Sequence, residues 1–358
     1  MRLVEDKSTI NARDEAERIS EILQLAGLVD TSTQHDKITC NRRESTMKSI
    51  LNIAASLAMI AFASPAMAED GALSFILVTQ GQANDTFWNV VKNGALAAGK
   101  EVGANVEYRS PETFDMVAMG QLIDAAVNQK PDGIAVSIPD GDGLGPSIQR
   151  AREAGIAVVS IVNGGDVHEK VGSMVHIGQD EHLAGIAAGK KLKELGAKKG
   201  ICINVEPGNV SLDLRCQGFA EGLEGPVTTI PTSLDPSENV SKIRAALETD
   251  PTIDAVLGTS APFSGEPAVT AVAELGKKDS VHVATFDLSP SILQSIADGD
   301  AEFAVDQQQY LDGYMAVIFL KAYKDTGVMP VGQVLTGPRL VTADTAKSVL
   351  ELSAAGLR

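Results

Sequence analysis

Short apolar runs rich in β-branched residues alternate with longer amphipathic segments through most of this 358-residue chain. Strands are predicted at residues 73–79, 106–108, 133–138, 157–162, 200–205, 255–258 and 281–286. Helices are predicted at residues 87–102, 116–128, 148–154, 183–195, 212–223 and 289–297. Continuous apolar strands between helices indicate parallel sheets covered on both faces, with right-handed crossovers. Because the series restarts after His176, the sequence predicts an α/β protein with two doubly wound, Rossmann-like parallel-sheet domains.

The length of the chain fits two such domains, at roughly 150 residues per domain. No low-complexity linker separates the two halves. We therefore expect a hinge at which the chain crosses several times, with a cleft between the domains. Ligands of open α/β sheets bind at the carboxyl ends of the strands, so these ends are where chemistry is expected.

Acidic residues outnumber basic ones by 47 to 30, which gives a net charge of −17. This charge repels a phosphate backbone, so we predict that the protein does not bind nucleic acid. Three cysteines are too few for a disulfide scaffold and lack the spacing of a zinc site. Neither a metal nor a cofactor is predicted.

The segment that begins at Met47 has the order of a secretory signal peptide, residues 47–68. Lys48 precedes an apolar run at 50–62, and the small-residue triplet Ala66-Met67-Ala68 follows. We expect cleavage after Ala68 and export of a soluble protein to a bacterial periplasm. Residues 1–46 are then expected to be an over-extended gene prediction or a disordered extension.

A competing interpretation of the N-terminal residues remains. The stretch 17–32, with its Leu25-Ala26-Gly27 turn, has some features of a helix-turn-helix, which would make the chain a sugar-responsive transcriptional regulator. The acidic charge and the signal peptide both count against this alternative.

Polar side chains follow the predicted strands. Asp85, Phe87 and Trp88 come after the first strand, and Trp88 is the only tryptophan. Further polar residues follow later strands: Asn163, Glu206, Asn209, Ser260, Asp287 and Gln307, with Arg215 in the next predicted helix after Asn209. Amides, hydroxyls, carboxylates and one guanidinium form a hydrogen-bonding cage, and aromatic rings pack on the C–H faces of sugars. The pattern favours a neutral polyhydroxylated ligand.

From about Leu73 to its end, the chain resembles the type I periplasmic sugar-binding proteins, the ribose- and galactose-binding family that supplies ABC transporters. The motifs that carry the resemblance are Thr86-Phe87-Trp88, Gly178-Gln179-Asp180-Glu181, Arg215 to Phe219, Phe286-Asp287, and Gln307 before Gly313.

The resemblance implies a set of ligand-binding residues: Asp85, Phe87, Trp88, Asn163, Asn209, Arg215, Ser260, Asp287 and Gln307. It implies that Arg215 donates to ligand oxygens and that Asp287 accepts from two hydroxyls. Ribose binders have Asp-Arg after the fourth strand, where this chain has Val162-Asn163. A sugar or a sugar-like polyol therefore remains open as the ligand.

The resemblance also implies how the chain is divided and what it does. The first lobe would comprise 71–176 plus 306–332, and the second 177–305 plus 333–358. Both lobes would close around the ligand, and a membrane permease would recognise the closed form. A chemoreceptor is a further candidate partner, and we expect a monomer that leaves its ligand chemically unchanged.

The acidic residues and histidines do not favour an enzyme. Asp180-Glu181-His182 has no second set of metal ligands to accompany it. Asp85, Asp213 and Asp287 can serve as hydroxyl acceptors as well as glycosidase carboxylates, so we predict no enzyme.

Cys202 lies in a predicted strand and Cys216 in the next helix. A disulfide between them and a pair of buried thiols are both left open.

Overall fold

The computed structural model describes residues 71–82 and 85–358, and these residues form one compact unit. The predicted signal peptide, the prefix before it and the helix-turn-helix alternative lie outside the described residues.

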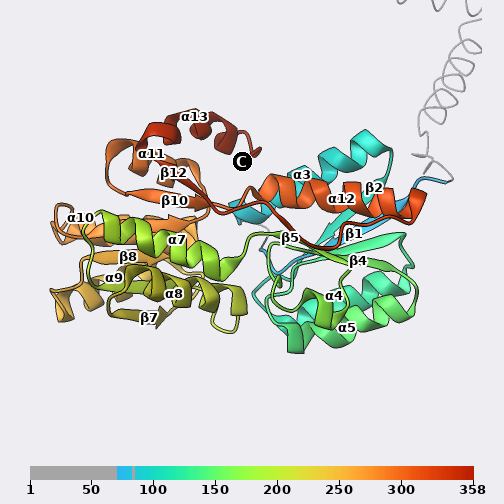
Figure 1. Cartoon of the computed structure of the whole chain (residues 1–358), viewed down its shortest axis with the longest axis horizontal. Helices are drawn as coiled ribbons and strands as arrows, with labels where there is room; N and C mark the ends of the chain where they lie inside the picture. The colour runs from blue at the N-terminus through green and yellow to red at the C-terminus, as the bar shows by residue number, and fades with distance from the viewer. Residues whose placement is uncertain (1–70, 83–84) are drawn as a thin grey trace, which may run out of the picture. The chain divides into compact units, whose positions relative to one another are not determined.

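The first sheet has six parallel strands in the order β11-β5-β4-β3-β1-β2 (Figure 1). Its strands are β1 (Ser74–Val78), β2 (Asn105–Arg109), β3 (Gly133–Val136), β4 (Ala157–Ile161), β5 (Val175–Gly178) and β11 (Gly332–Leu335). The helices connected to it are α3 (Thr86–Val102), α4 (Met116–Asn128), α5 (Gly141–Glu153), α6 (His168–Val171) and α12 (Gln309–Thr326).

The second sheet repeats this arrangement in the order β12-β10-β9-β8-β6-β7, with β12 antiparallel to β10. Its strands are β6 (Gly200–Asn204), β7 (Val227–Pro231), β8 (Ala255–Gly258), β9 (His282–Phe286), β10 (Phe303–Asp306) and β12 (Arg339–Thr342). Its helices are α7 (Glu181–Glu194), α8 (Val210–Leu223), α9 (Pro236–Thr249), the π-helix η1 (Ala261–Gly265), α10 (Glu266–Glu274), α11 (Pro290–Asp298) and α13 (Ala343–Ala354).

Each sheet is buried on both faces, which explains why its central strands are continuously apolar. In β1, Phe75 and Leu77 pack against α3 and α12, whereas Ile76 and Val78 pack against α4 and α5 on the other face. The second sheet likewise has one core under α7 and α8 and another under α9, α10, α11 and α13. The predicted fold class, two doubly wound α/β domains, is confirmed.

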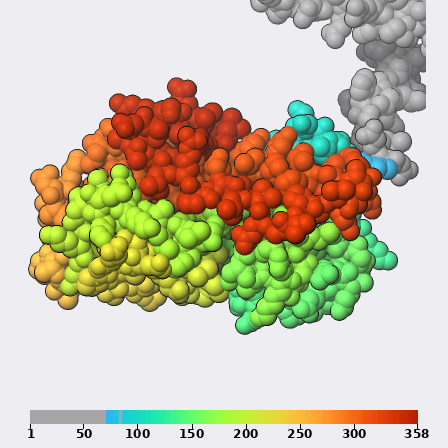
Figure 2. Space-filling view, in the orientation of Figure 1, coloured from blue at the N-terminus to red at the C-terminus, as the bar shows by residue number. Residues whose placement is uncertain are grey.

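The chain passes between the two sheets three times: from β5 to α7, from β10 to α12, and from β11 to β12. The second and third crossings are in contact, because the side-chain amide of Gln308 donates to the carbonyl oxygen of Thr336. Both belong to the orange-to-red part of the chain that covers much of the face seen in Figure 2.

All three expected lobe boundaries fall inside strands, and the one at 305/306 lies one residue before the end of β10. The boundaries 176/177 and 332/333 fall inside β5 and β11, which pair in parallel from Val175 and Gly332 to Gly178 and Leu335. Both strands continue to the carboxyl edge of the first sheet, so the chain leaves that sheet a few residues later than expected.

Candidate functional site

A cavity with a free volume of about 380 Å³, open solvent included, lies at the carboxyl ends of strands from both sheets. The cavity is lined by all nine residues predicted as ligand-binding: Asp85, Phe87, Trp88, Asn163, Asn209, Arg215, Ser260, Asp287 and Gln307. It is also lined by residues that were not predicted for this role, among them Gln80, Glu206, Thr259, Leu234 and Phe263.

The start of α3 supplies the aromatic wall of the cavity. Asp85 caps this helix, since its Oδ1 accepts from the backbone nitrogen of Phe87 at 2.9 Å. The rings of Phe87 and Trp88 meet edge to face, with centroids 5.2 Å apart. Gly81 makes room for the indole, because a Cβ there would lie 2.0 Å from Trp88 Cγ. Both aromatic side chains are therefore part of the core and of the cavity wall at once.

An amide pair lines the cavity on the same side. Gln80 follows β1 and donates from Nε2 to Oδ1 of Asn163 at 2.6 Å, while Ser137 donates to the Oε1 of Gln80. Gln80 was missed from the sequence although it stands directly after a predicted strand. Its position at a strand end was the available signal.

The second sheet contributes a carboxylate and amide pair after β6. Asn209 caps α8 by accepting from the nitrogen of Ser211, and its Nδ2 donates to Glu206 Oε2 at 2.7 Å. Glu206 lies in the same turn as the predicted Asn209 and is buried. The two side chains thus hold each other at the cavity wall.

Arg215 is the one cation among the residues that line the cavity, and it is 2% exposed. Its guanidinium lies 4.4 Å from the ring centroid of Phe286. Nη1 donates to the carbonyl oxygen of Thr259 at 2.8 Å and lies 4.0 Å from Asp287 Oδ1. Nε and Nη2 donate to the two carboxylate oxygens of Glu181, at 2.6 and 2.9 Å.

The residues directly after β4 and β9 share an unusual backbone conformation. Val162 has φ of 64° and Asp287 has φ of 70°, both in the left-handed region. Since β4 and β9 occupy equivalent places in the two sheets, the same turn is used twice to direct chain into the cavity. Asp287 then accepts from Nε2 of Gln307, at 2.5 Å.

The three carboxyl groups that line the cavity share a raised pKa. Burial raises the pKa of Asp85, Glu206 and Asp287 to about 7 in each case. The charge of Glu206 adds to the rise at Asp85, and Arg215 opposes it at Glu206 and Asp287. The cavity is therefore rich in acceptor groups that also exchange protons near neutral pH.

A comparison with protein families finds a periplasmic binding protein domain over residues 75–327. The chain belongs to the periplasmic binding protein family. A carbohydrate transporter from Acidothermus cellulolyticus, solved in complex with myo-inositol, is 35% identical. The match covers 80% of this chain and 100% of that one, with a TM-score of 0.76.

Two curated members of the family are similar in sequence. The xylose/arabinose-binding protein XylF of Sulfolobus acidocaldarius is 27% identical over 257 residues. The match covers 66% of this periplasmic binding protein and 63% of the length of XylF. The D-ribose/D-allose-binding protein of Pseudomonas aeruginosa is 26% identical over 286 residues, 75% of this chain and 88% of that protein.

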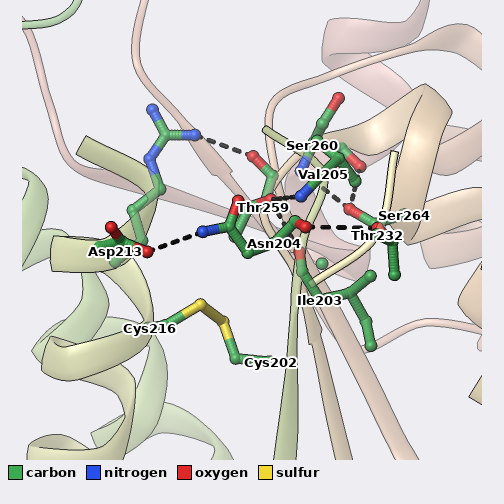
Figure 3. Close-up of a disulfide and its surroundings, with 12 residues drawn as sticks. Cys202, Ile203, Asn204, Val205, Asp213, Cys216, Thr232, Thr259, Ser260 and Ser264 are labelled. Atoms are coloured by element: carbon green, nitrogen blue, oxygen red, sulfur yellow. Dashed lines mark hydrogen bonds between the residues drawn. A yellow bond between two sulfur atoms is a disulfide. The ribbon is translucent and has the colours of Figure 1, made fainter. Parts of the chain in front are cut away.

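In this binding protein a disulfide joins Cys202 of β6 to Cys216 of α8 (Figure 3). Sequence alone left the choice between a disulfide and two thiols open. Asp213 does not line the cavity. Its Oδ1 accepts instead from the side-chain amide of Asn204 at 2.8 Å. The disulfide and this hydrogen bond both tie α8, and with it Arg215, to the second sheet.

The remaining charged candidates lie away from the cavity. His182 pairs with Glu221 at 3.2 Å on the surface between α7 and α8. Over residues 71–82 and 85–358, no group of three or more His, Cys, Asp or Glu is placed to hold a metal ion. Within the same ranges, no helix has the length and apolar character needed to cross a membrane.

Proposed function

We propose that this protein captures a sugar or sugar-like polyol by closure of its two lobes and delivers it to the permease of an ABC transporter. The observation that carries the proposal is the convergence of nine predicted polar and aromatic side chains on one cavity beside three chain crossings. Its relatives are sugar-binding proteins, which favours this function over the transcriptional regulator.

The chemistry of the lining suits a ring that carries hydroxyl groups on all sides. Carboxyl oxygens of Asp85, Glu206 and Asp287 accept from hydroxyls, and Arg215 donates to them. Phe87 and Trp88 offer apolar surface to C–H faces. The first ligand to test is myo-inositol, because the 35% identical relative was solved with it.

Lobe closure is supported by one backbone contact outside the cavity. The nitrogen of Val210, at the start of α8, donates to the carbonyl oxygen of Pro139 at 2.9 Å. Pro139 follows β3 of the first sheet, so this bond joins elements of the two lobes. A rotation about the crossings would break it and open the cavity.

The proposal includes a leader peptide and an unchanged ligand. Export after cleavage at Ala68 would place the protein in the periplasm, and mass spectrometry of the exported protein should find a mature start at Glu69. We infer no catalytic step, so the ligand should be recovered intact.

A thermal-shift screen tests the function directly. Protein that has been unfolded and refolded to remove bound ligand is screened against pentoses, hexoses and inositols. A ligand at 100 times its dissociation constant stabilises the fold by roughly 2.7 kcal/mol, which is a clear shift. A shift with one class and none with sugar-free controls is expected, whereas no shift with any polyol would oppose the proposal.

A further inference from the structure

Glu181 makes the closest polar contact of Arg215 and yet does not line the cavity. It is the first residue of α7, immediately after the first crossing, and its side chain is 5% exposed. Gln179, in that crossing, donates to Glu181 Oε2 at 2.8 Å. The carboxylate is therefore fixed from the hinge side, and it holds the guanidinium through two parallel hydrogen bonds.

We propose that Glu181 neutralises Arg215 from outside the cavity, so that the cavity keeps an excess of carboxyl groups and selects neutral or cationic polyols over anionic sugars. This inference rests on the proposed function. Glu181 acts through Arg215, so it is a positioning residue and makes no contact with the ligand in this account.

The charges around the cavity support this selectivity. Its lining contains three carboxyl groups, from Asp85, Glu206 and Asp287, and one cation, Arg215. Arg215 also lies 4.0 Å from Asp287, but once Glu181 is included the cluster has four carboxyl groups against this one cation. A hydroxyl or ammonium group can donate to them, whereas a carboxylate or phosphate on the ligand would be repelled.

The same geometry makes the pKa values of Asp287 and Glu206 depend on Glu181. Removal of the Glu181 charge leaves the charge of Arg215 to act on Asp287 and Glu206, which favours their ionised forms. Glu206 in turn acts on Asp85, which also faces Tyr108 of β2. Glu181 also faces Asp312 of α12, and the charges of Glu181 and of Asp306 in β10 both add to the raised pKa of Asp312.

The deciding experiment is a pH titration of the Asp287 and Glu206 carboxyl groups in ligand-free protein, followed by carbon-13 NMR and assigned with D287N and E206Q. In the wild type each group should titrate with a midpoint near pH 7. E181Q should lower both midpoints by about one unit or more, because the charge of Arg215 then acts on these two groups without the opposing charge of Glu181. The conservative variant E181D should restore them.

E221Q is the matched control, because Glu221 pairs with His182 across the same two helices but on the surface. Its midpoints should equal those of the wild type. Unchanged midpoints in E181Q would overturn the inference. Should E181Q fail to fold, a wild-type titration without a midpoint between about pH 6 and 8 would overturn it as well.

Charge selectivity is tested on the wild type with D-glucose, D-glucosamine and D-glucuronate, three pyranoses of similar size. Glucuronate should bind about 100-fold more weakly than glucose or worse, and glucosamine should bind at least as tightly as glucose. Equal binding of glucuronate would contradict the inference. Failure of all three to bind, together with no thermal shift for any polyol in the screen, would count against the proposed function, and the ligand-free titration would still decide the role of Glu181.

Discussion

Two residues that line the cavity, Val162 and Asp287, have left-handed backbone conformations. Asp287 takes a left-handed backbone that Asp tolerates better than most residues, whereas Val162 is β-branched and pays a larger steric cost. Such conformations persist only where the surrounding structure enforces them, and they cluster at functional sites. Here each one turns the chain from a buried strand into the cavity.

Asp287→Asn should weaken binding of the polyol found in the screen by about 1.5–3 kcal/mol, because a charged acceptor is lost from a buried site. Asparagine tolerates the left-handed backbone, so the fold should be retained. Isothermal titration calorimetry measures the change, with the exposed Asp279→Asn as control. An affinity equal to that of the control would remove Asp287 from the ligand contacts.

Asp85→Asn should stabilise the ligand-free protein at pH 8. The pKa of the folded carboxyl is raised to about 7, so its cost in stability grows as the pH rises above the unfolded pKa of about 4 and is complete above about pH 7. Asparagine also caps helices, so α3 keeps its cap. Thermal unfolding should show a gain of roughly 4 kcal/mol at pH 8 and almost none at pH 4. An equal effect at both pH values would contradict the raised pKa.

At the scale of elements, most central strands and half of the helices were predictable, because they are apolar on every side that meets the core. The predicted helices at 87–102 and 116–128 match α3 and α4 to within one residue. The edge strands β7, β11 and β12 were not predicted, since half-exposed strands have no continuous apolar run and depend on distant pairing. Helices α9, α10, α12 and α13 and the π-helix η1 also went unpredicted.

Helix α5 shows why boundaries are harder to predict than elements. It begins at Gly141, seven residues before the predicted start at 148, and contains three glycines and Pro146 in its first half. Those residues are typical of a loop. Asp140 reverses that preference by accepting from the nitrogens of Asp142 and Gly143, at 2.9 and 3.2 Å.

Glycines set how closely α7 and α8 approach. A Cβ on Gly218 would lie 2.1 Å from the carbonyl oxygen of His182, so Gly218→Ala should destabilise the fold by about 1–3 kcal/mol. Gly120 of α4 is the matched control, because its Cβ would meet only Ser147 Oγ at 3.5 Å. Gly120→Ala should be neutral or stabilise by up to about 1 kcal/mol. Chemical denaturation measures both, and similar effects would refute the close packing of α7 on α8.

At the scale of the whole molecule, the two sheets share one strand order, and the cavity exists only because both are present. The repeat and the strand-end position of the ligand residues could be predicted from the sequence. The partners of these residues could not, because Glu181 and Arg215, or Gln80 and Asn163, are brought together by the crossings and by tertiary packing.

Lobe closure should be visible in solution. Under the proposed closure, the form in which the Val210–Pro139 bond is made is the closed one. Small-angle X-ray scattering should therefore give a smaller radius of gyration in saturating myo-inositol, or in the polyol found by the screen, than without ligand. The fluorescence of Trp88 should change over the same ligand concentrations. A radius unaffected by a ligand that calorimetry shows to bind would contradict the hinge.

The most direct test of the central claim is isothermal titration calorimetry of the refolded, ligand-free protein with myo-inositol and the pentoses, followed by analysis of the recovered ligand. The account predicts saturable binding of one polyol per chain, weakened in Asp287→Asn, with the ligand recovered unchanged. Absence of binding to every polyol, or conversion of a bound one into a product, would contradict it.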